Sequence, residues 1–426
     1  MLLRAAMVAD GDGVACAPGA VLLEGDEILA AGPPPAVGHP PEAEVVDLPD
    51  AVVVPALVNA HCHLDLSHLP PVAYTGDWGG WLEMVRAGRA TSDADIAASV
   101  EKGVELARRG GTALVGDIAG AGSLVPLEAL RRLGLAGVAF LEVFGLGRRQ
   151  GGAVDTLRRV AEQDSGPERG VRLGLGPHAP YTCGPEVYRA AAGLGRPWST
   201  HLAETPAEIE FVGAGTGPLR RLLEAVGAWD ETVAPWGQHP VDALAESLAA
   251  APCVAAHLNY IEPRHVEALA GWPVTVAYCP RASRYFGHAA DGPAPHRYRQ
   301  MLDAGVNVAL GTDGLLCLDT PDRISVLDEM RLLHRHDGTD PVVLLRMATV
   351  AGAVGLGFDP ALVTLAPGPT AGLLALPIAR GRGLDPLRQI MQSDDPPQWV
   401  LGPVPGDQLP GPDPDLLARK ASKSPS

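Results

Sequence analysis

The sequence predicts an α/β protein built around a (β/α)8 TIM barrel, and two observations support this. Strongly apolar runs, typical of strands buried on both faces, recur along the chain, and helical patterns such as those over Asp93–Arg109 and Gly184–Leu194 separate most of them. Histidine and carboxylate residues follow several of these runs, at the carboxyl ends of strands, where such barrels hold their active sites. The predicted strands begin near Val52, Thr112, Gly137, Val171, Pro197, Cys253, Val274 and Val306.

Short β segments with turns are predicted at both ends of the chain, outside the barrel. One set lies within residues 1–50, and similar apolar segments lie near residues 361–380. The residues after Pro403 are rich in Pro, Gly, Asp and Ser, which predicts a flexible tail over 403–426. The long connection over 205–250 is expected to form a lid or a pocket wall, with an ordinary surface excursion as the alternative.

The composition argues against several classes of protein. The chain has 426 residues, of which 46% are hydrophobic and 19% are charged, as in an ordinary globular protein. A formal net charge of −17 argues against a nucleic-acid partner, because such a partner requires a basic face. The six cysteines show no Cys-x-x-Cys spacing, and no apolar run reaches membrane-spanning length. We therefore expect a cytoplasmic enzyme that does not enter a membrane.

Candidate metal ligands stand at the predicted strand ends. His61 and His63 follow the first apolar run, and residues two apart on a strand face the same side, so both imidazoles can reach one ion. Imidazole and carboxylate ligands suit a catalytic zinc or iron ion with one position left for water. Any one of these residues alone is also compatible with a hydrogen-bonded residue at the barrel rim. The other residues of ligand type at strand ends are His178, His201, His257 and Asp313.

Taken together, these residues resemble the amidohydrolase superfamily. The similarity rests on four motifs: His61-Cys62-His63, His201 with Glu204 three residues later, His257, and Gly311-Thr312-Asp313-Gly314. Within the superfamily the chain resembles the ATZ/TRZ-type aminohydrolases of nucleobases and nucleosides, through residues 177–181, 201–205 and 279–281. It is also similar to the aminofutalosine deaminase subgroup, through residues 59–67, 81–82 and 140–145.

The resemblance implies one bound divalent metal ion, zinc or alternatively iron. His61, His63 and His201 are the expected imidazole ligands, and Asp313 completes the site either as a ligand or as a base beside the water. None of the three lysines lies at a strand end, so the carbamylated lysine that bridges two ions in many relatives is excluded. A carboxylate bridge by Glu142 between two ions stays open as the alternative.

The resemblance also implies how the chain is divided. Residues 1–50 and 358–402 are expected to join into one composite β-sandwich beside a barrel formed by residues 51–357. The sequence fits this arrangement because apolar β segments occur in both terminal regions. A homodimer is compatible with this organisation, and the sequence does not determine the oligomeric state.

For catalysis the resemblance implies hydrolytic deamination of an amino-substituted heterocycle, in which an activated water attacks an amidine-like carbon and ammonia leaves. Glu204 is expected to shuttle a proton to the neighbouring ring nitrogen and Asp313 to accept a proton from the water. His257 is expected to hydrogen-bond the developing tetrahedral centre. The predicted substrate is a purine nucleoside derivative such as aminofutalosine. The alternatives are amide hydrolysis on the same scaffold and a non-catalytic scaffold protein.

Seven residues are candidates for binding this small heterocyclic substrate. The resemblance implies substrate contact by His178. Trp78 and Glu83 combine an aromatic ring with a carboxylate, which suits stacking on a heterocycle and holding a ribose hydroxyl. Glu142 is a further candidate, as a group that contacts substrate or supports the site. The last three are residues that suit a substrate carboxylate or phosphate, unless they only brace their loop: Arg281, Arg284 and His288.

Overall fold

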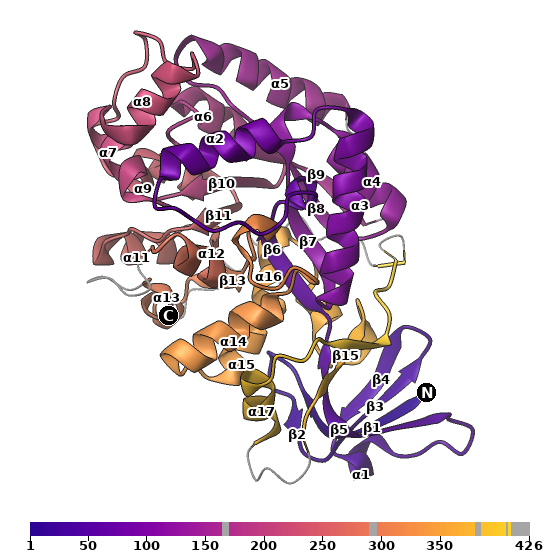
Figure 1. Cartoon of the computed structure of the whole chain (residues 1–426). Coiled ribbons are helices and arrows are strands. Elements are labelled where there is room, and N and C mark those ends of the chain that lie inside the picture. Colours follow the sequence, from indigo (N-terminus) through magenta and orange to yellow (C-terminus); the bar gives the residue numbers. More distant parts are fainter. Residues whose placement is uncertain (164–169, 289–295, 380–384, 406–407, 410–426) are drawn as a thin grey trace.

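The computed structural model describes residues 1–163, 170–288, 296–379, 385–405 and 408–409. Within these residues the strands form two sheets of eight strands each (Figure 1). One sheet closes into a barrel, and the other, at the lower right of Figure 1, contains the N-terminus. The predicted TIM barrel is therefore confirmed.

The barrel strands are parallel, and their order in the sheet follows their order in the chain. The first and last strands meet through a parallel bridge between Cys62 and Asp313, and the Thr312 N–H donates to the His61 carbonyl at 2.9 Å. The first and last candidate ligands are thereby brought together. The barrel strands are β6 (Leu57–Cys62), β7 (Thr112–Ala119), β8 (Ala136–Val143), β9 (Val171–Pro177), β10 (Trp198–Leu202), β11 (Cys253–His257), β12 (Val274–Tyr278) and β13 (Asn307–Leu310).

Seven predicted strands begin within one residue of the expected position, but the first does not. The apolar run that begins near Val52 belongs to two sheets, because β5 (Val45–Pro55) pairs with β15 as far as Pro55 and β6 begins only at Leu57. The chain crosses at Ala56, whose N–H donates to the Gly372 carbonyl at 2.9 Å. Residues 52–60 are buried throughout, so the apolar run shows no break at the crossing.

The second sheet joins both ends of the chain, as predicted. It is one curled sheet, whose strands hydrogen-bond in one continuous order from β14 to β16, with β2 paired to β1. The boundaries near residues 50 and 358 stay predictions, and most of the predicted tail lies outside the described residues. Besides β5, this sheet contains β1 (Leu2–Ala9), β2 (Ala15–Cys16), β3 (Gly19–Glu24), β4 (Glu27–Gly32), β14 (Gly368–Pro369), β15 (Leu373–Pro377) and β16 (Gln398–Leu401).

Helices cover the outside of the barrel (Figure 1). α3 (Asp93–Arg109) has the predicted bounds, and Ser92 caps it by accepting a hydrogen bond from the Asp95 N–H at 3.1 Å. α6 (Pro185–Gly193) begins and ends one residue inside its prediction. The other helices are α1 (Pro34–Val37), α2 (Trp78–Gly88), α4 (Val125–Leu133), α5 (Gln150–Gln163), α7 (Pro206–Ala214), α8 (Gly217–Ala225), α9 (Pro240–Ala243), α10 (Ala245–Ala250), α11 (Pro263–Ala270), α12 (Pro280–Tyr285), α13 (Tyr298–Asp303), α14 (Val326–Asp337), α15 (Pro341–Met347), α16 (Val350–Leu356) and α17 (Pro386–Gln392).

α16 closes the amino-terminal end of the barrel. It contacts β6, β12 and β13, and two of its glycines permit the close approach. A Cβ atom on Gly352 would lie 2.6 Å from Val58 Cγ1, and one on Gly355 would lie 2.6 Å from Thr275 Cγ2. Because Val58 and Thr275 stand near the beginnings of their strands, the open end of the barrel is the carboxyl end, where the candidate ligands lie.

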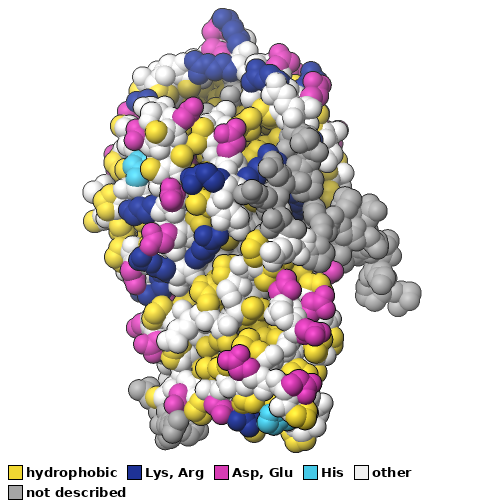
Figure 2. All heavy atoms as spheres, turned by 90° about the vertical axis from the view of Figure 1, so that its right-hand side faces the viewer, with side chains coloured by type: hydrophobic (Ala, Val, Ile, Leu, Met, Phe, Trp, Pro, Cys, Tyr) yellow, Lys and Arg dark blue, Asp and Glu magenta, His cyan; other side chains and the backbone are white. Residues whose placement is uncertain are grey.

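The surface carries charges of both signs. In Figure 2, Lys and Arg side chains gather over the upper part, while acidic side chains are more frequent than basic ones over the lower part. The described part of this face shows no continuous basic surface. Among the described helices, none combines the length and apolar character needed to cross a bilayer.

Candidate active site

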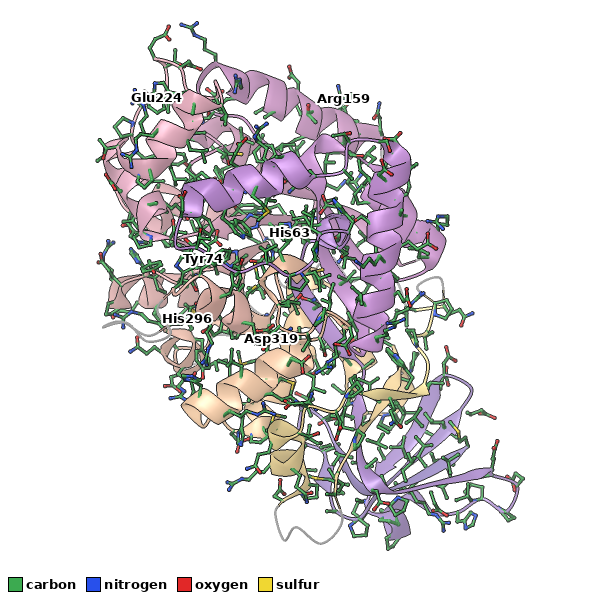
Figure 3. The ribbon with its side chains drawn as sticks, viewed as in Figure 1. His63, Tyr74, Arg159, Glu224, His296 and Asp319 are labelled. Carbon is green, nitrogen blue, oxygen red and sulfur yellow. The ribbon has the colours of Figure 1, made fainter. Side chains whose placement is uncertain are left out.

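Three imidazoles meet at the open end of the barrel. His61 and His63 stand at the end of β6, and His201 stands on β10. The ring centroids of His61 lie 5.2 Å from His63 and 4.9 Å from His201, and those of His63 and His201 lie 5.4 Å apart. One nitrogen of each ring lies within 4.8 Å of the other two. Figure 3 shows His63 in the middle of the barrel, whereas Arg159 and Glu224 lie at its periphery.

The hydrogen bonding of these imidazoles fits a metal ion. His201 Nδ1 lies 2.9 Å from the His178 carbonyl, which fixes its N–H there and leaves the lone pair on Nε2, 3.3 Å from His63 Nε2. Both ring nitrogens of the buried His61, and Nδ1 of His63, have no hydrogen-bond partner among the described residues. Buried polar atoms are normally satisfied, so these nitrogens suit a cation that prefers imidazole, such as zinc.

A second cluster adjoins the first. Glu204, His257 and Asp313 each offer one atom within 4.8 Å of the other two, and His257 Nε2 lies 3.7 Å from Glu204 Oε1. Asp313 Oδ1 lies 3.4 Å from His63 Nε2, which joins the two clusters. The structure therefore brings together all six residues that the sequence proposed for metal binding and catalysis.

Unusual backbone conformations aim these side chains inward. The positive φ angles of non-glycine residues in the described chain fall at the ends of three barrel strands: 50° at Ala203, 72° at His257, 51° at Leu258 and 60° at Asp313. Such conformations cost about 1–3 kcal/mol each and persist only where surrounding contacts impose them. At Asp313 those contacts include its N–H, which donates to the His61 carbonyl at 3.1 Å.

Burial sets the protonation states in the site. It lowers the pKa of His61, His63 and His257 well below the ordinary range, and neighbouring imidazoles lower it further. The neutral imidazole is the form that binds a metal. Burial raises the pKa of Glu204 well above its usual range, with nearby Asp313 adding to the effect. A carboxyl group held in its acid form can donate a proton.

A cavity of about 350 Å³ lies above the two clusters. His63, His201, Glu204, His257 and Asp313 are part of its lining. The connection over 205–250 forms one wall, because four of its residues line the cavity, and this supports the predicted pocket wall over a surface excursion. These four residues are Leu222, Leu223, Val226 and Ala228.

Four of the seven predicted substrate residues line this cavity: Trp78, Glu83, Glu142 and His178. The Trp78 ring stacks on Trp81 with centroids 5.5 Å apart, and both are in the lining. Glu83 is also hydrogen-bonded to Arg86, at 2.6 and 2.8 Å. His178 Nδ1 lies 2.7 Å from the Thr182 hydroxyl, so its Nε2 lies on the side of Glu142, 3.9 Å from Oε1.

The other three are not in the lining of this cavity. Arg281 is buried and braces its loop, which is the alternative that the sequence analysis gave for it. Its Nε donates to Glu329 at 2.6 Å and its Nη1 donates to Asp319 at 3.2 Å. Arg284 is exposed and lines a neighbouring cavity together with Arg281. His288 packs behind Trp78, with ring centroids 5.8 Å apart.

Two polar residues at the site escaped the sequence analysis. Arg89, at the C-terminus of α2, lines the cavity and forms ion pairs with Asp65 at 2.8 Å and with Glu142 at 3.2 Å. Glu208, on α7, is fully buried and accepts hydrogen bonds from the turn that carries Glu204. Neither belongs to a recognisable motif: the partners of Arg89 come from distant parts of the chain, and the Glu208 carboxylate bonds backbone N–H groups, which leave no mark in the sequence.

One further histidine cluster, away from the barrel axis, does not suit a metal. His239, Asp242 and His265 offer ligand atoms within 4.8 Å of one another. Both nitrogens of His239 are used, since Nδ1 accepts from the Val241 N–H and Nε2 donates to the Tyr260 carbonyl. His265 likewise accepts from the Glu262 N–H and pairs with Asp242. These histidines cap the N-termini of α9 and α11.

The model of the amidohydrolase family matches residues 52–404 of this chain. The chain belongs to the amidohydrolase family. The predicted resemblance is thereby confirmed, and with it a hydrolase that acts on carbon–nitrogen bonds. The placement of the imidazole and carboxylate residues around one barrel end agrees with this membership.

Curated relatives cover most of the chain. The 5-methylthioadenosine/S-adenosylhomocysteine deaminase of Moorella thermoacetica is 31% identical over 377 residues, which cover 84% of this chain and 80% of the relative. The aminodeoxyfutalosine deaminase of Deinococcus radiodurans is 31% identical over 377 residues, covering 82% of this chain and 84% of the relative. A zinc-bound adenosine deaminase structure from Xanthomonas campestris shares the fold, with a TM-score of 0.71 and 21% identity over 99% of this chain and 97% of that one.

Proposed function

We propose that this amidohydrolase deaminates an adenosine-like nucleoside derivative by hydrolysis, with the help of one divalent metal ion. The observation that carries the proposal is the union of two clusters at the floor of one cavity: three imidazoles and, beside them, Glu204, His257 and Asp313. The names of the Moorella and Deinococcus relatives support the same reaction.

The residues that would hold the ion are His61, His63 and His201, with Asp313 as the fourth group. A bound divalent ion supplies a Lewis acid that lets water act as a nucleophile near neutral pH. Zinc is the preferred metal, because the donor set is rich in imidazole and the Xanthomonas neighbour holds zinc. Iron suits the same donors and remains the alternative metal.

The protein groups then divide the proton transfers. Asp313 accepts a proton from the attacking water. Glu204, whose raised pKa favours the acid form, delivers a proton to the ring nitrogen beside the attacked carbon. His257, 3.7 Å from Glu204 and with Nε2 otherwise unsatisfied among the described residues, hydrogen-bonds the tetrahedral centre that forms. Asp313 then gives its proton to the amino group, and the hydroxyl of the tetrahedral centre returns a proton to Glu204. Collapse of that centre forms the carbonyl bond, breaks the carbon–nitrogen bond and releases ammonia.

A permanent cation beside the imidazoles supports one metal ion rather than two. Glu142, His178 and His201 offer ligand atoms within 4.8 Å of one another, which is a candidate place for a second ion. The Arg89 guanidinium, which stays charged, already pairs with Glu142 at 3.2 Å and is anchored by Asp65 at 2.8 Å. A second divalent cation at Glu142 would meet this positive charge.

Metal counting tests this argument. After dialysis against excess zinc, we expect the unmodified enzyme to retain about one ion per chain and Arg89→Met to retain more, approaching about two, because Asp65 and Glu142 lose their counter-cation. Elemental analysis measures the ratio. Arg86→Met is the matched control, since Arg86 also lines the cavity but pairs with the exposed Glu83. Two ions in the unmodified enzyme, or one in Arg89→Met, would contradict it.

The cavity favours a nucleoside with an extended substituent. Its mouth is apolar: Phe144 is 47% exposed and Val226 is 40% exposed, although both are large hydrophobic residues in the lining. Arg86 and Arg149 also line it and offer positive charge to an anion. An apolar wall with cations suits a substrate that carries an aryl group and a carboxylate, as aminofutalosine does.

Ammonia release by the metal-loaded enzyme tests the proposed function. A coupled assay would compare aminofutalosine, 5′-methylthioadenosine, S-adenosylhomocysteine, adenosine, guanine, cytosine and aminotriazines, with a chelator-treated sample as control. We expect kcat/KM to be highest for aminofutalosine, and activity to be lost on chelation and restored by zinc. Ammonia from no compound despite bound metal would overturn the deaminase proposal and favour amide hydrolysis.

A further inference from the structure

The carboxylate of Glu204 is carried by a sharp turn. Directly after β10 the chain passes through Ala203, whose φ of 50° is rare for a residue with a side chain, and α7 then begins at Pro206. The Glu204 side chain, which follows this turn directly, lines the cavity. Whatever holds the turn therefore determines where the proton donor of the proposed reaction stands.

The Glu208 carboxylate holds this turn from the helix side. Its Oε1 accepts from the Ala203 N–H at 2.8 Å, and its Oε2 accepts from the Glu204 N–H at 2.9 Å. Glu208 is itself fixed, because its own N–H donates to the Thr205 hydroxyl at 3.1 Å in the cap of α7. On the opposite side, the Asn259 amide donates to the Glu204 carbonyl at 3.1 Å. The two peptide groups that flank the Glu204 α-carbon are therefore both fixed.

The position of Glu208 is costly for a carboxylate. The residue is fully buried, does not line the cavity, and forms no ion pair with a described residue. A buried carboxylate without a counter-cation costs free energy. What it provides here is two acceptor oxygens on one rigid planar group, directed at two successive N–H groups, and no neutral side chain provides that pair.

We propose that Glu208 is a positioning residue, which acts on the reaction by holding the Glu204 carboxyl at the distance that proton transfer to the substrate requires. This proposal rests on the proposed function, because it takes Glu204 as the proton donor. Glu208 touches neither substrate nor metal ligands; it acts through the backbone of residues 203 and 204, together with Asn259.

Steady-state kinetics of Glu208→Gln test the proposal. Glutamine keeps the shape and one acceptor, but sets its NH2 group against the other N–H. Because displacement of a catalytic group by about 1 Å costs about 100-fold in rate, we expect kcat per bound metal ion to fall about 10–100-fold, while KM stays within about threefold. Metal content should be unchanged. The matched control is Glu210→Gln, on the same helix, where the carboxylate is exposed and bonds only the Thr216 hydroxyl among the described residues.

Two further variants keep the test decisive. Asn259→Ser removes the support of the peptide on the other side of the Glu204 α-carbon, and we expect the same loss of kcat at constant KM even if Glu208→Gln does not fold. Unchanged kcat per metal ion in either folded variant would overturn the proposal. Failure of the proposed function has a different signature: the unmodified, metal-loaded enzyme would then release ammonia from none of the compounds. Failure of this inference alone leaves the unmodified enzyme active, Glu204→Gln inactive and Glu208→Gln active.

Discussion

Replacement of Glu204 by Gln is expected to lower kcat by about 10²–10⁴-fold, the usual contribution of a positioned proton donor. The amide cannot deliver a proton to the ring nitrogen, but it has nearly the same size as the carboxyl group. The metal would be held by three imidazoles and not by Glu204, so the zinc content should not change. The measurement is kcat and KM for the best substrate, with zinc determined on the same sample.

A dependence on pH separates proton donation from a merely structural role. Burial raises the pKa of Glu204 well above its usual range, which favours the acid form, and that form is lost as pH rises through the raised pKa. The unmodified enzyme should therefore lose kcat/KM on the alkaline side, and Glu204→Gln should lack that limb. Glu224→Gln is the control, because Glu224 is exposed, pairs with Arg220 and lies at the periphery in Figure 3. Equal profiles in Glu204→Gln and the unmodified enzyme would contradict the assigned role.

The ligand set could be predicted because, in a barrel, a residue at the end of a strand in the sequence has a known location in the fold. In parallel strands, residues at the carboxyl ends come together whatever their distance in sequence. His61 and Asp313 illustrate this, since Asp313, which follows β13, is bridged directly to Cys62 at the end of β6. The sequence could not reveal that the run near Val52 crosses from one sheet to the other at Ala56, because both sheets bury it completely.

Residues whose partners lie on other segments of the chain could not be predicted from the sequence. Arg89 stands at the end of a helix, and its partners Asp65 and Glu142 come from the chain after β6 and from β8. The guanidinium of Arg281 suits either an anion of the substrate or a brace of its own loop, and the sequence does not choose between them because the carboxylate that fixes it belongs to α14. Composition and spacing give the type of side chain at the rim, whereas the direction of that side chain depends on packing.

The Arg281 brace leads to the largest expected change in stability. Its Nε donates to Glu329 Oε1 at 2.6 Å, and its backbone N–H donates to Glu329 Oε2 at 2.8 Å; both side chains are buried. Removal of one partner of a buried ion pair leaves the other charge uncompensated, which costs about 3–5 kcal/mol. We expect Arg281→Leu to lower the free energy of unfolding by about this amount, measured by denaturant unfolding. KM of the folded fraction should not change, because Arg281 is not in the cavity lining.

The pH dependence of this loss identifies its cause. Burial raises the pKa of Glu329 from 4.5 to about 7, although Arg281 opposes the shift. A carboxyl with a raised folded pKa binds more protons when folded, so stability falls as pH rises from the unfolded to the folded pKa. Without Arg281 the folded pKa rises further, so the stability gap to the unmodified protein should widen between about pH 6 and about pH 8. The double variant Arg281→Leu/Glu329→Gln removes the unpaired buried charge and should recover most of the lost stability. A double variant no more stable than Arg281→Leu would instead assign the loss to packing. A raised KM in Arg281→Leu would show that Arg281 takes part in substrate binding.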